Sequence, residues 1–77
     1  MTRDEVLRAM EEAAFMPAGT LQGTEVLTSL SSWDSLSGAE FRLIVLERWQ
    51  VSLAGTAVVE CETVADIVNL LGAHVED

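Results

Sequence analysis

SLSGAEFRLIVLERW, residues 35–49, is the most regular segment of this 77-residue chain. Its large apolar side chains recur at positions i, i+3, i+4 and i+8, namely Phe41, Ile44, Val45 and Trp49. This spacing is typical of an α-helix that buries one side in a core. We therefore predict a helix over residues 35–49, and we expect it to be the central helix of the fold.

The opposite side of this helix, at about 100° per residue, mixes apolar and acidic residues. Its members are Leu36, Ala39, Glu40, Leu43 and Glu47. Such a mixture indicates neither a buried core nor a purely solvated surface. It predicts a side that either covers a neighbouring element or docks a partner.

The start of this helix carries two polar residues with different expected roles. Asp34 is a good N-cap, because its carboxylate can accept from the free backbone N–H groups of the first turn and its charge suits the positive end of the helix dipole. Ser35 is then the first helical residue, with its hydroxyl near solvent. Two hypotheses follow: Ser35 is a second cap candidate, or it is an exposed serine that accepts a modification.

The sequence pattern over residues 1–16 predicts the first helix. Thr2 is a good N-cap and Glu5 stands at the third helical position, so Thr2-Arg3-Asp4-Glu5 has the form of a capping box. Apolar residues such as Met10 repeat at helical spacing and are interpreted as core. The charged residues form the expected solvent-facing side: Arg3, Asp4, Arg8, Glu11 and Glu12.

Residues 17–33 form a connection that exceeds the ordinary length of a helix–helix link. Pro17, Gly19 and Gly23 punctuate it. Trp33, at its end, is interpreted as a lid that fixes the start of the next helix, and the alternative is an exposed aromatic that contacts partners. The apolar residues expected to pin the loop on the bundle are Leu21, Val26, Leu27 and Leu30.

The remaining elements complete an all-α fold. Residues 50–53 are interpreted as an extended linker, because a lone short strand has no partner. Thr56 is expected to cap a short turn over 57–61, and Thr63-Val64-Ala65-Asp66 has the form of a capping box that opens the last helix. We predict a single domain over residues 1–77, a small four-helix bundle with three main helices, a short third helix and a long loop between the first two.

Composition restricts the classes of partner. The chain has thirteen acidic residues, four arginines and no lysine, and its net charge is −9. This balance argues against binding to nucleic acid or to an anionic membrane surface, and it favours a basic protein partner. No apolar run approaches the ~18 residues of a membrane span, and the charged start of the chain does not resemble a secretory signal. We therefore expect a monomeric cytoplasmic protein.

The chain offers no evident set of catalytic or metal-binding residues. Cys61 and His74 are the single cysteine and the single histidine, and one of each does not make an ordinary metal site. We interpret Cys61 as a small apolar core residue and His74 as a solvated residue of the tail. Because the sequence places no nucleophile, acid and base together, we do not expect an enzyme.

Three segments together resemble the acyl carrier proteins: Asp34-Ser35-Leu36, the helix end Leu46-Glu47-Arg48-Trp49, and the helix start at Thr63. The resemblance covers nearly the whole chain. It implies that Ser35 carries 4′-phosphopantetheine, whose thiol holds an acyl group as a thioester for enzymes of polyketide, fatty acid or related biosynthesis. The chain departs from the family at Leu30, five residues before Ser35 instead of four, and at the basic residues Arg42 and Arg48.

The resemblance also implies a partner surface. It would serve a phosphopantetheinyl transferase and an acyltransferase, a ketosynthase or an adenylating ligase, and its residues would be Asp34, Leu36, Glu40, Leu43 and Glu47. The aspartate before Ser35 favours an acyl carrier over a peptidyl carrier, whose motif usually has glycine there. Two alternatives stay open: an aminoacyl or peptidyl carrier loaded by an adenylating ligase, and an unmodified acidic helical interaction module in which Ser35 is only a cap.

Overall fold

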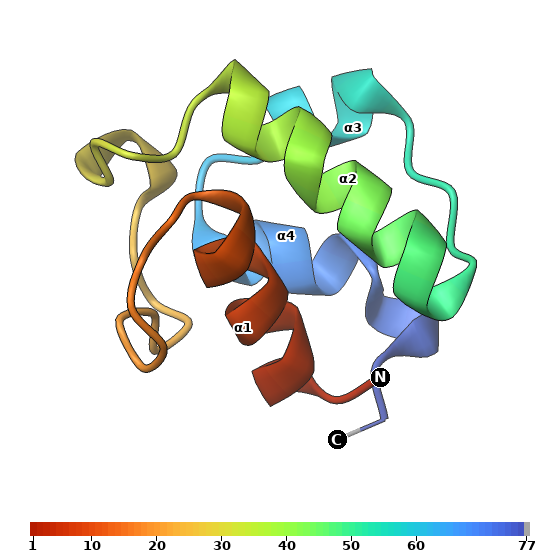
Figure 1. Cartoon of the computed structure of the whole chain (residues 1–77). Coiled ribbons are helices and arrows are strands. Elements are labelled where there is room, and N and C mark those ends of the chain that lie inside the picture. The colour runs from red at the N-terminus through yellow and green to blue at the C-terminus, as the bar shows by residue number, and fades with distance from the viewer. Residues whose placement is uncertain (77) are drawn as a thin grey trace.

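The computed structural model describes residues 1–76, so Asp77, the last residue of the predicted domain, lies outside the described part. Within residues 1–76 the chain forms four α-helices and no β-strand (Figure 1). They are α1 (Arg3–Ala13), α2 (Ser35–Trp49), α3 (Gly55–Val59) and α4 (Val64–Leu70), with 3₁₀ turns at Leu27–Ser29 and Gly72–His74. The predicted all-α four-helix bundle, with a short third helix and a long first connection, is confirmed.

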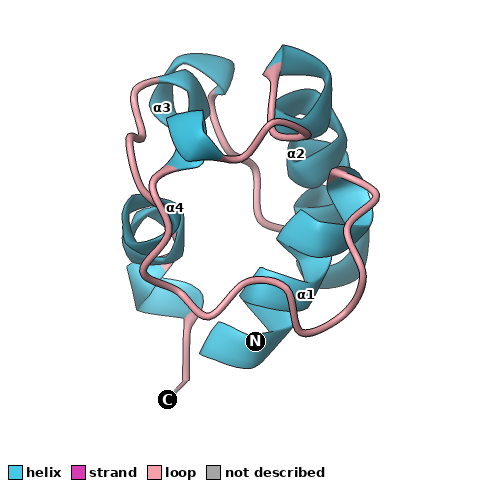
Figure 2. Ribbon diagram, turned by 90° about the vertical axis from the view of Figure 1, so that its left-hand side faces the viewer, coloured by secondary structure: helices cyan, strands magenta, loops and turns pink. Residues whose placement is uncertain are grey.

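The apolar sides of the four helices face one core. Figure 2 shows α1 and α2 on one side of the bundle and α3 and α4 on the other. As predicted, α2 buries Phe41, Ile44 and Val45. Other large buried side chains come from α1, the first connection, and α4 with its C-cap residue, namely Val6, Met10, Leu21, Val64, Ile67 and Leu71. Burying one such side chain is worth about 1.5–3 kcal/mol, so this core holds the bundle together.

Capping boxes start α1 and α4, as predicted. The hydroxyl of Thr2 accepts the backbone N–H of Glu5 at 3.1 Å, and the Glu5 carboxylate accepts the N–H of Thr2 at 2.8 Å. Thr63 and Asp66 make the same reciprocal pair at α4. The helix α1 ends at Ala13, before the predicted end at residue 16, because Phe15 adopts a left-handed φ of 59° that breaks the helical path.

The start of α3 differs from the prediction, which places a cap at Thr56. Gly55 is the first helical residue and Ala54 is the N-cap, without a side-chain hydrogen bond. The carbonyl of Ala54 accepts the backbone N–H of Val58 at 3.4 Å, so the helix begins before Thr56 and makes no use of its hydroxyl as a cap. Val58 is the buried residue of α3, whereas Val59 is 78 % exposed.

Glu11 is buried, although the sequence pattern places it on the solvent side of α1. It is 2 % exposed, because the first connection folds back over it. Its carboxylate accepts the backbone N–H of Leu21 at 2.7 Å and that of Gly19 at 3.3 Å. The Nε of Arg8 lies 2.9 Å from Glu11 Oε1, as an ion pair without hydrogen-bond geometry. Because a buried carboxylate is tolerated only when partners offset its desolvation, these contacts tie the loop to α1.

The end of the first connection is held by the start of α4 through the backbone. The N–H of Leu27 donates to the carbonyl of Glu62, and the N–H of Val64 to that of Glu25, both at 2.9 Å. Val26 lies between these bonds and is 47 % exposed, so the prediction that its side chain pins the loop is wrong. The other predicted pins contact the core: Leu21, Leu27 and Leu30.

The two ends of the described chain meet beside α1 (Figure 1). The backbone N–H of Glu76 donates to the carbonyl of Met1 at 2.8 Å. None of the helices in residues 1–76 combines the length and the hydropathy that a membrane crossing requires. The longest helix, α2, keeps one side in solvent, and the predicted site residues lie on and around it.

Candidate functional site

Asp34 caps α2, as predicted. Its Oδ1 accepts the backbone N–H of Ser37 at 2.9 Å. The Ser37 hydroxyl lies 3.1 Å from the same oxygen and 2.7 Å from the carbonyl oxygen of Ser32, and it donates its one proton to either. The backbone N–H of Ser37, followed by its hydroxyl, holds the pKa of Asp34 below its ordinary value. The cap is therefore an ionised carboxylate at neutral pH.

Ser35 is the first residue of α2, and its side chain is exposed. It makes no capping hydrogen bond, because Asp34 supplies the cap. Within residues 1–76 no group hydrogen-bonds its hydroxyl. Of the two roles considered for Ser35, the capping role is thus taken by its neighbour, and the hydroxyl is open to solvent and to another molecule.

Trp33 closes over the start of α2. Its ring meets the ring of Phe41 edge-to-face, with centroids 6.0 Å apart and an interplanar angle of 65°. Phe41 is fully buried and Trp33 packs at the edge of the core. This contact agrees with the interpretation of Trp33 as a lid. An apolar residue before an N-cap usually packs on the fourth helical residue, which here is Gly38 and has no side chain, so Trp33 packs on Phe41 instead.

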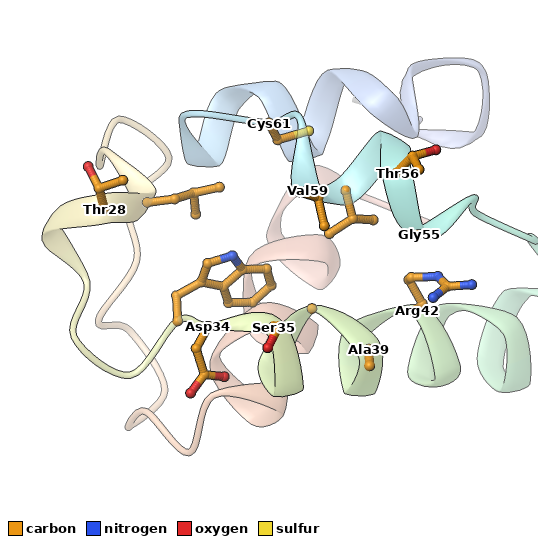
Figure 3. A pocket seen from close by; sticks show the side chains of 13 residues that line it. Thr28, Asp34, Ser35, Ala39, Arg42, Gly55, Thr56, Val59 and Cys61 are labelled. Carbon is orange, nitrogen blue, oxygen red and sulfur yellow. The ribbon is translucent and has the colours of Figure 1, made fainter.

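A groove of about 500 Å³ lies beside Ser35, between α2 and α3 (Figure 3). We call it the α2–α3 groove. Its lining is mostly apolar and includes Trp33, Ser35, Gly38, Arg42, Val59 and Cys61. The sequence pattern does not predict this groove. The signal that could have indicated it is the pair of small residues Gly38 and Ala39, which leave space on the α2 surface.

Cys61 lines the groove as a neutral thiol. It is partly buried, and its Sγ donates to the carbonyl of Ala57 at 3.3 Å. Burial raises the pKa of the Cys61 thiol, and the negative charges of Asp66 and Glu60 raise it further. A protonated, partly buried thiol is a poor nucleophile. Cys61 is predicted to be a small apolar core residue, and it packs against the core from its edge without being fully buried.

The predicted partner-binding residues lie on the solvent side of α2. Leu36 is 78 % exposed and Leu43 is 48 % exposed, and Glu40 and Glu47 are exposed as well. Leu46, which the sequence analysis did not single out, is 46 % exposed. This side therefore stays open in the described chain instead of covering a neighbour. We call Asp34, Leu36, Glu40, Leu43 and Glu47 the acidic face of α2.

Arg42 and Arg48 both contact other parts of the bundle. Arg48 Nη2 lies 2.6 Å from Glu12 Oε1 and so joins α2 to α1. Both side chains are about half exposed, and such a pair adds no more than about 1 kcal/mol. Arg42 Nε donates to the carbonyl of Leu53 at 3.0 Å and holds the linker after α2. Figure 3 shows the Arg42 side chain reaching from α2 towards Gly55.

The structure brings the predicted site residues together along one helix. Asp34, Ser35 and Leu36 are adjacent at its start, and Glu47 lies about 18 Å further along at 1.5 Å per residue. A surface of this length suits a protein partner better than a small ligand. Comparison with protein-family models, with curated proteins and with solved structures finds no match for the chain. Its function is therefore inferred from the start of α2 and the groove beside it.

Proposed function

We propose that the chain is a carrier protein of the acyl carrier type, in which Ser35 is the attachment point for 4′-phosphopantetheine. The position of Ser35 supports this best. Its exposed hydroxyl stands at the first position of the longest helix and is relieved of capping by Asp34. The mostly apolar α2–α3 groove lies next to it.

The surroundings of Ser35 fit a phosphodiester. The N-terminus of the 15-residue α2 carries a partial positive charge that favours an anion there. The charge of Asp34 opposes this, but its Oδ1 is engaged by Ser37. Trp33 and Val59, in the adjacent groove, offer apolar surface to the pantetheine arm and to the acyl chain that it carries. The residues present therefore suit both ends of phosphopantetheine.

Attachment needs little chemistry from this chain. Ser35 Oγ attacks the phosphorus that bears the pantetheine arm in coenzyme A, an Oγ–P bond forms, and the P–O bond to the second phosphate breaks so that adenosine bisphosphate leaves. The serine proton passes to a base on the transferase, because within residues 1–76 no group hydrogen-bonds the Ser35 hydroxyl. When bound, the group supplies a thiol that holds an acyl chain as a thioester.

Partner enzymes would meet the acidic face of α2. Leu36 offers an apolar anchor beside Ser35, and Glu40 and Glu47 offer carboxylates to cationic side chains. The net charge of −9 favours basic partners and makes the encounter rate fall as salt rises. A phosphopantetheinyl transferase and the loading and accepting enzymes would share this face.

The acidic face of α2 also supports a second function, that of an unmodified acidic interaction module. This face is exposed along α2 without any modification of Ser35, so an unmodified acidic interaction module would present it equally well. In that case Ser35 would be a solvated first-turn residue with no chemical role. An aminoacyl or peptidyl carrier would use Ser35 in the same way as an acyl carrier and differ in the loading enzyme.

Transfer of phosphopantetheine separates the carrier from the unmodified module. The chain and its Ser35→Ala variant are incubated with coenzyme A and a broad-specificity phosphopantetheinyl transferase, and their intact masses are measured. A mass gain of one phosphopantetheine in the unchanged chain alone supports the carrier. No gain, under conditions that fully modify a reference carrier, leaves the interaction module.

A further inference from the structure

Arg42 differs from Arg8 and Arg48 in its surroundings. Arg8 lies within ion-pair range of Glu11, and Arg48 within range of Glu12. Arg3 donates to the carbonyl of Gln22 at 3.0 Å. In the described chain no carboxylate lies within ion-pair range of Arg42. In an acidic protein, this half-buried cation therefore has no carboxylate partner among residues 1–76.

The Arg42 guanidinium is anchored at one nitrogen and has unused donors at the others. Its Nε donates to the carbonyl of Leu53 at 3.0 Å. A Cβ placed on Gly55 would lie 3.0 Å from Arg42 Nη1, so the guanidinium packs closely against the start of α3. Neither Nη1 nor Nη2 donates a hydrogen bond within residues 1–76. The side chain therefore presents free N–H donors at one end of the α2–α3 groove.

The groove is polarised along its length. Ser35 and Arg42 are seven residues apart on α2, which corresponds to about 10 Å. Trp33, Val59 and Cys61 line the groove with apolar groups and a neutral thiol. The other charged group in the lining is Asp34, which belongs to the Ser35 end. The Arg42 end thus carries one positive charge that no acidic side chain of the lining balances.

We propose that Arg42 makes the α2–α3 groove selective for an acyl chain whose far end carries a carboxylate. The proposal rests on attachment at Ser35. Charge complementarity carries it, because an anion satisfies the unused N–H donors with charge-assisted hydrogen bonds, whereas a methyl-ended chain leaves them facing hydrocarbon. The apolar middle of the groove suits the methylene part of the chain, and a volume of about 500 Å³ is in the range of small-molecule sites.

The test measures the pKa of the carboxyl at the far end of the chain. Suberoyl-phosphopantetheine, labelled with ¹³C in that carboxyl, is transferred from its coenzyme A thioester to the unchanged chain, to Arg42→Gln and to Arg48→Gln. Arg48→Gln is the matched control, since it changes the net charge equally on the same helix but lies outside the groove. A cation lowers the pKa of a nearby carboxyl. We therefore expect the pKa of the labelled carboxyl to be about one unit lower in the unchanged chain and in Arg48→Gln than in Arg42→Gln.

Two further samples keep the result specific. Arg42→Lys retains the positive charge. We therefore expect the carboxyl pKa in this variant to lie between those of the unchanged chain and Arg42→Gln, even if the hydrogen bond to Leu53 is lost. With octanoyl in place of suberoyl, the NMR resonance of Arg42 Nε–H is expected to stay near its position in the form that carries the free thiol. Equal carboxyl pKa values in the unchanged chain and Arg42→Gln overturn the role of Arg42 while leaving attachment intact. Failure of every variant to accept the group at Ser35 overturns both proposals.

Discussion

The Oδ1 of Asp34 lies 2.9 Å from the backbone nitrogen of Ser37, so the cap of α2 spans Ser35 without using its hydroxyl. The Asp34 carboxylate thereby accepts a first-turn N–H group that has no partner within the helix, so no serine hydroxyl is needed as a cap. The arrangement separates two tasks that the sequence alone assigns to the same pair of residues. Asp34 fixes the helix start, and the Ser35 side chain stays exposed.

The Asp34 cap predicts a pH dependence of stability. Hydrogen bonds from Ser37 lower the folded-state pKa of Asp34, so its contribution is present above the ordinary pKa of an aspartate and is lost as the pH falls through the folded-state pKa. We expect the unchanged chain to be more stable than Asp34→Asn at pH 6, and the difference to narrow towards about pH 3. Urea unfolding at both pH values measures this. A constant difference would contradict it, and Glu40→Gln, at an exposed position outside the cap, is the control.

Glu11 is predicted to hold the first connection in place. Glu11→Ala leaves the buried N–H of Leu21 without its acceptor and removes the nearest carboxylate of Arg8, so we expect a loss of about 2–4 kcal/mol. Glu12→Ala removes a half-exposed pair with Arg48 and should lose less than about 1 kcal/mol. Denaturant unfolding compares the two variants, and hydrogen exchange at the Leu21 amide should speed up only in Glu11→Ala. Equal losses in both variants would show that Glu11 does not have this role.

The two threonines near α3 and α4 are predicted to behave differently. Thr63→Ala removes the hydroxyl that accepts the N–H of Asp66 and should lower the free energy of unfolding by about 1 kcal/mol. Thr56→Ala should change it by less than about 0.5 kcal/mol, because Thr56 does not cap α3. Thermal unfolding of both variants measures the contrast. A larger loss for Thr56→Ala would restore Thr56 as the cap.

The acidic face of α2 is predicted to act in recognition and not in folding. Leu36→Ala should leave stability within about 0.5 kcal/mol, since the side chain is 78 % exposed, yet lower kcat/KM of the transferase for this chain. Phe15→Ala is the matched control, because Phe15 is exposed and lies outside this face. We also expect kcat/KM to fall as salt rises. If both variants are modified at the rate of the unchanged chain, Leu36 is not an anchor.

Local features of the fold could be predicted from the sequence. The caps at Thr2, Asp34 and Thr63 depend on residues within one helical turn, and the stripe centred on Phe41 depends on spacing alone. These features involve residues that are close together in the sequence, so hydrophobic pattern and residue propensity suffice to predict them. The exposed hydroxyl of Ser35 follows from the cap in the same way.

Features that join distant segments could not be predicted in this way. Glu11 lies in a charged pattern that is typical of a solvated side, and only the return of the loop at Leu21 buries it. The pair of Arg48 with Glu12 crosses 36 residues. The groove depends on how closely α3 approaches α2 at Gly55 and Arg42. Each of these requires the packing of the whole bundle, which a local pattern does not contain.

The mass of the chain after transfer from coenzyme A tests the role of Ser35 most directly, when Ser35→Ala and Ser37→Ala are measured together. Ser37 lies two residues away, but its hydroxyl is buried and hydrogen-bonded, which makes it a matched control. We predict one added phosphopantetheine in the unchanged chain and in Ser37→Ala, located on Ser35 by fragmentation, and none in Ser35→Ala. An unchanged mass in all three, beside a fully modified reference carrier, or a gain that persists in Ser35→Ala, would contradict the proposed function.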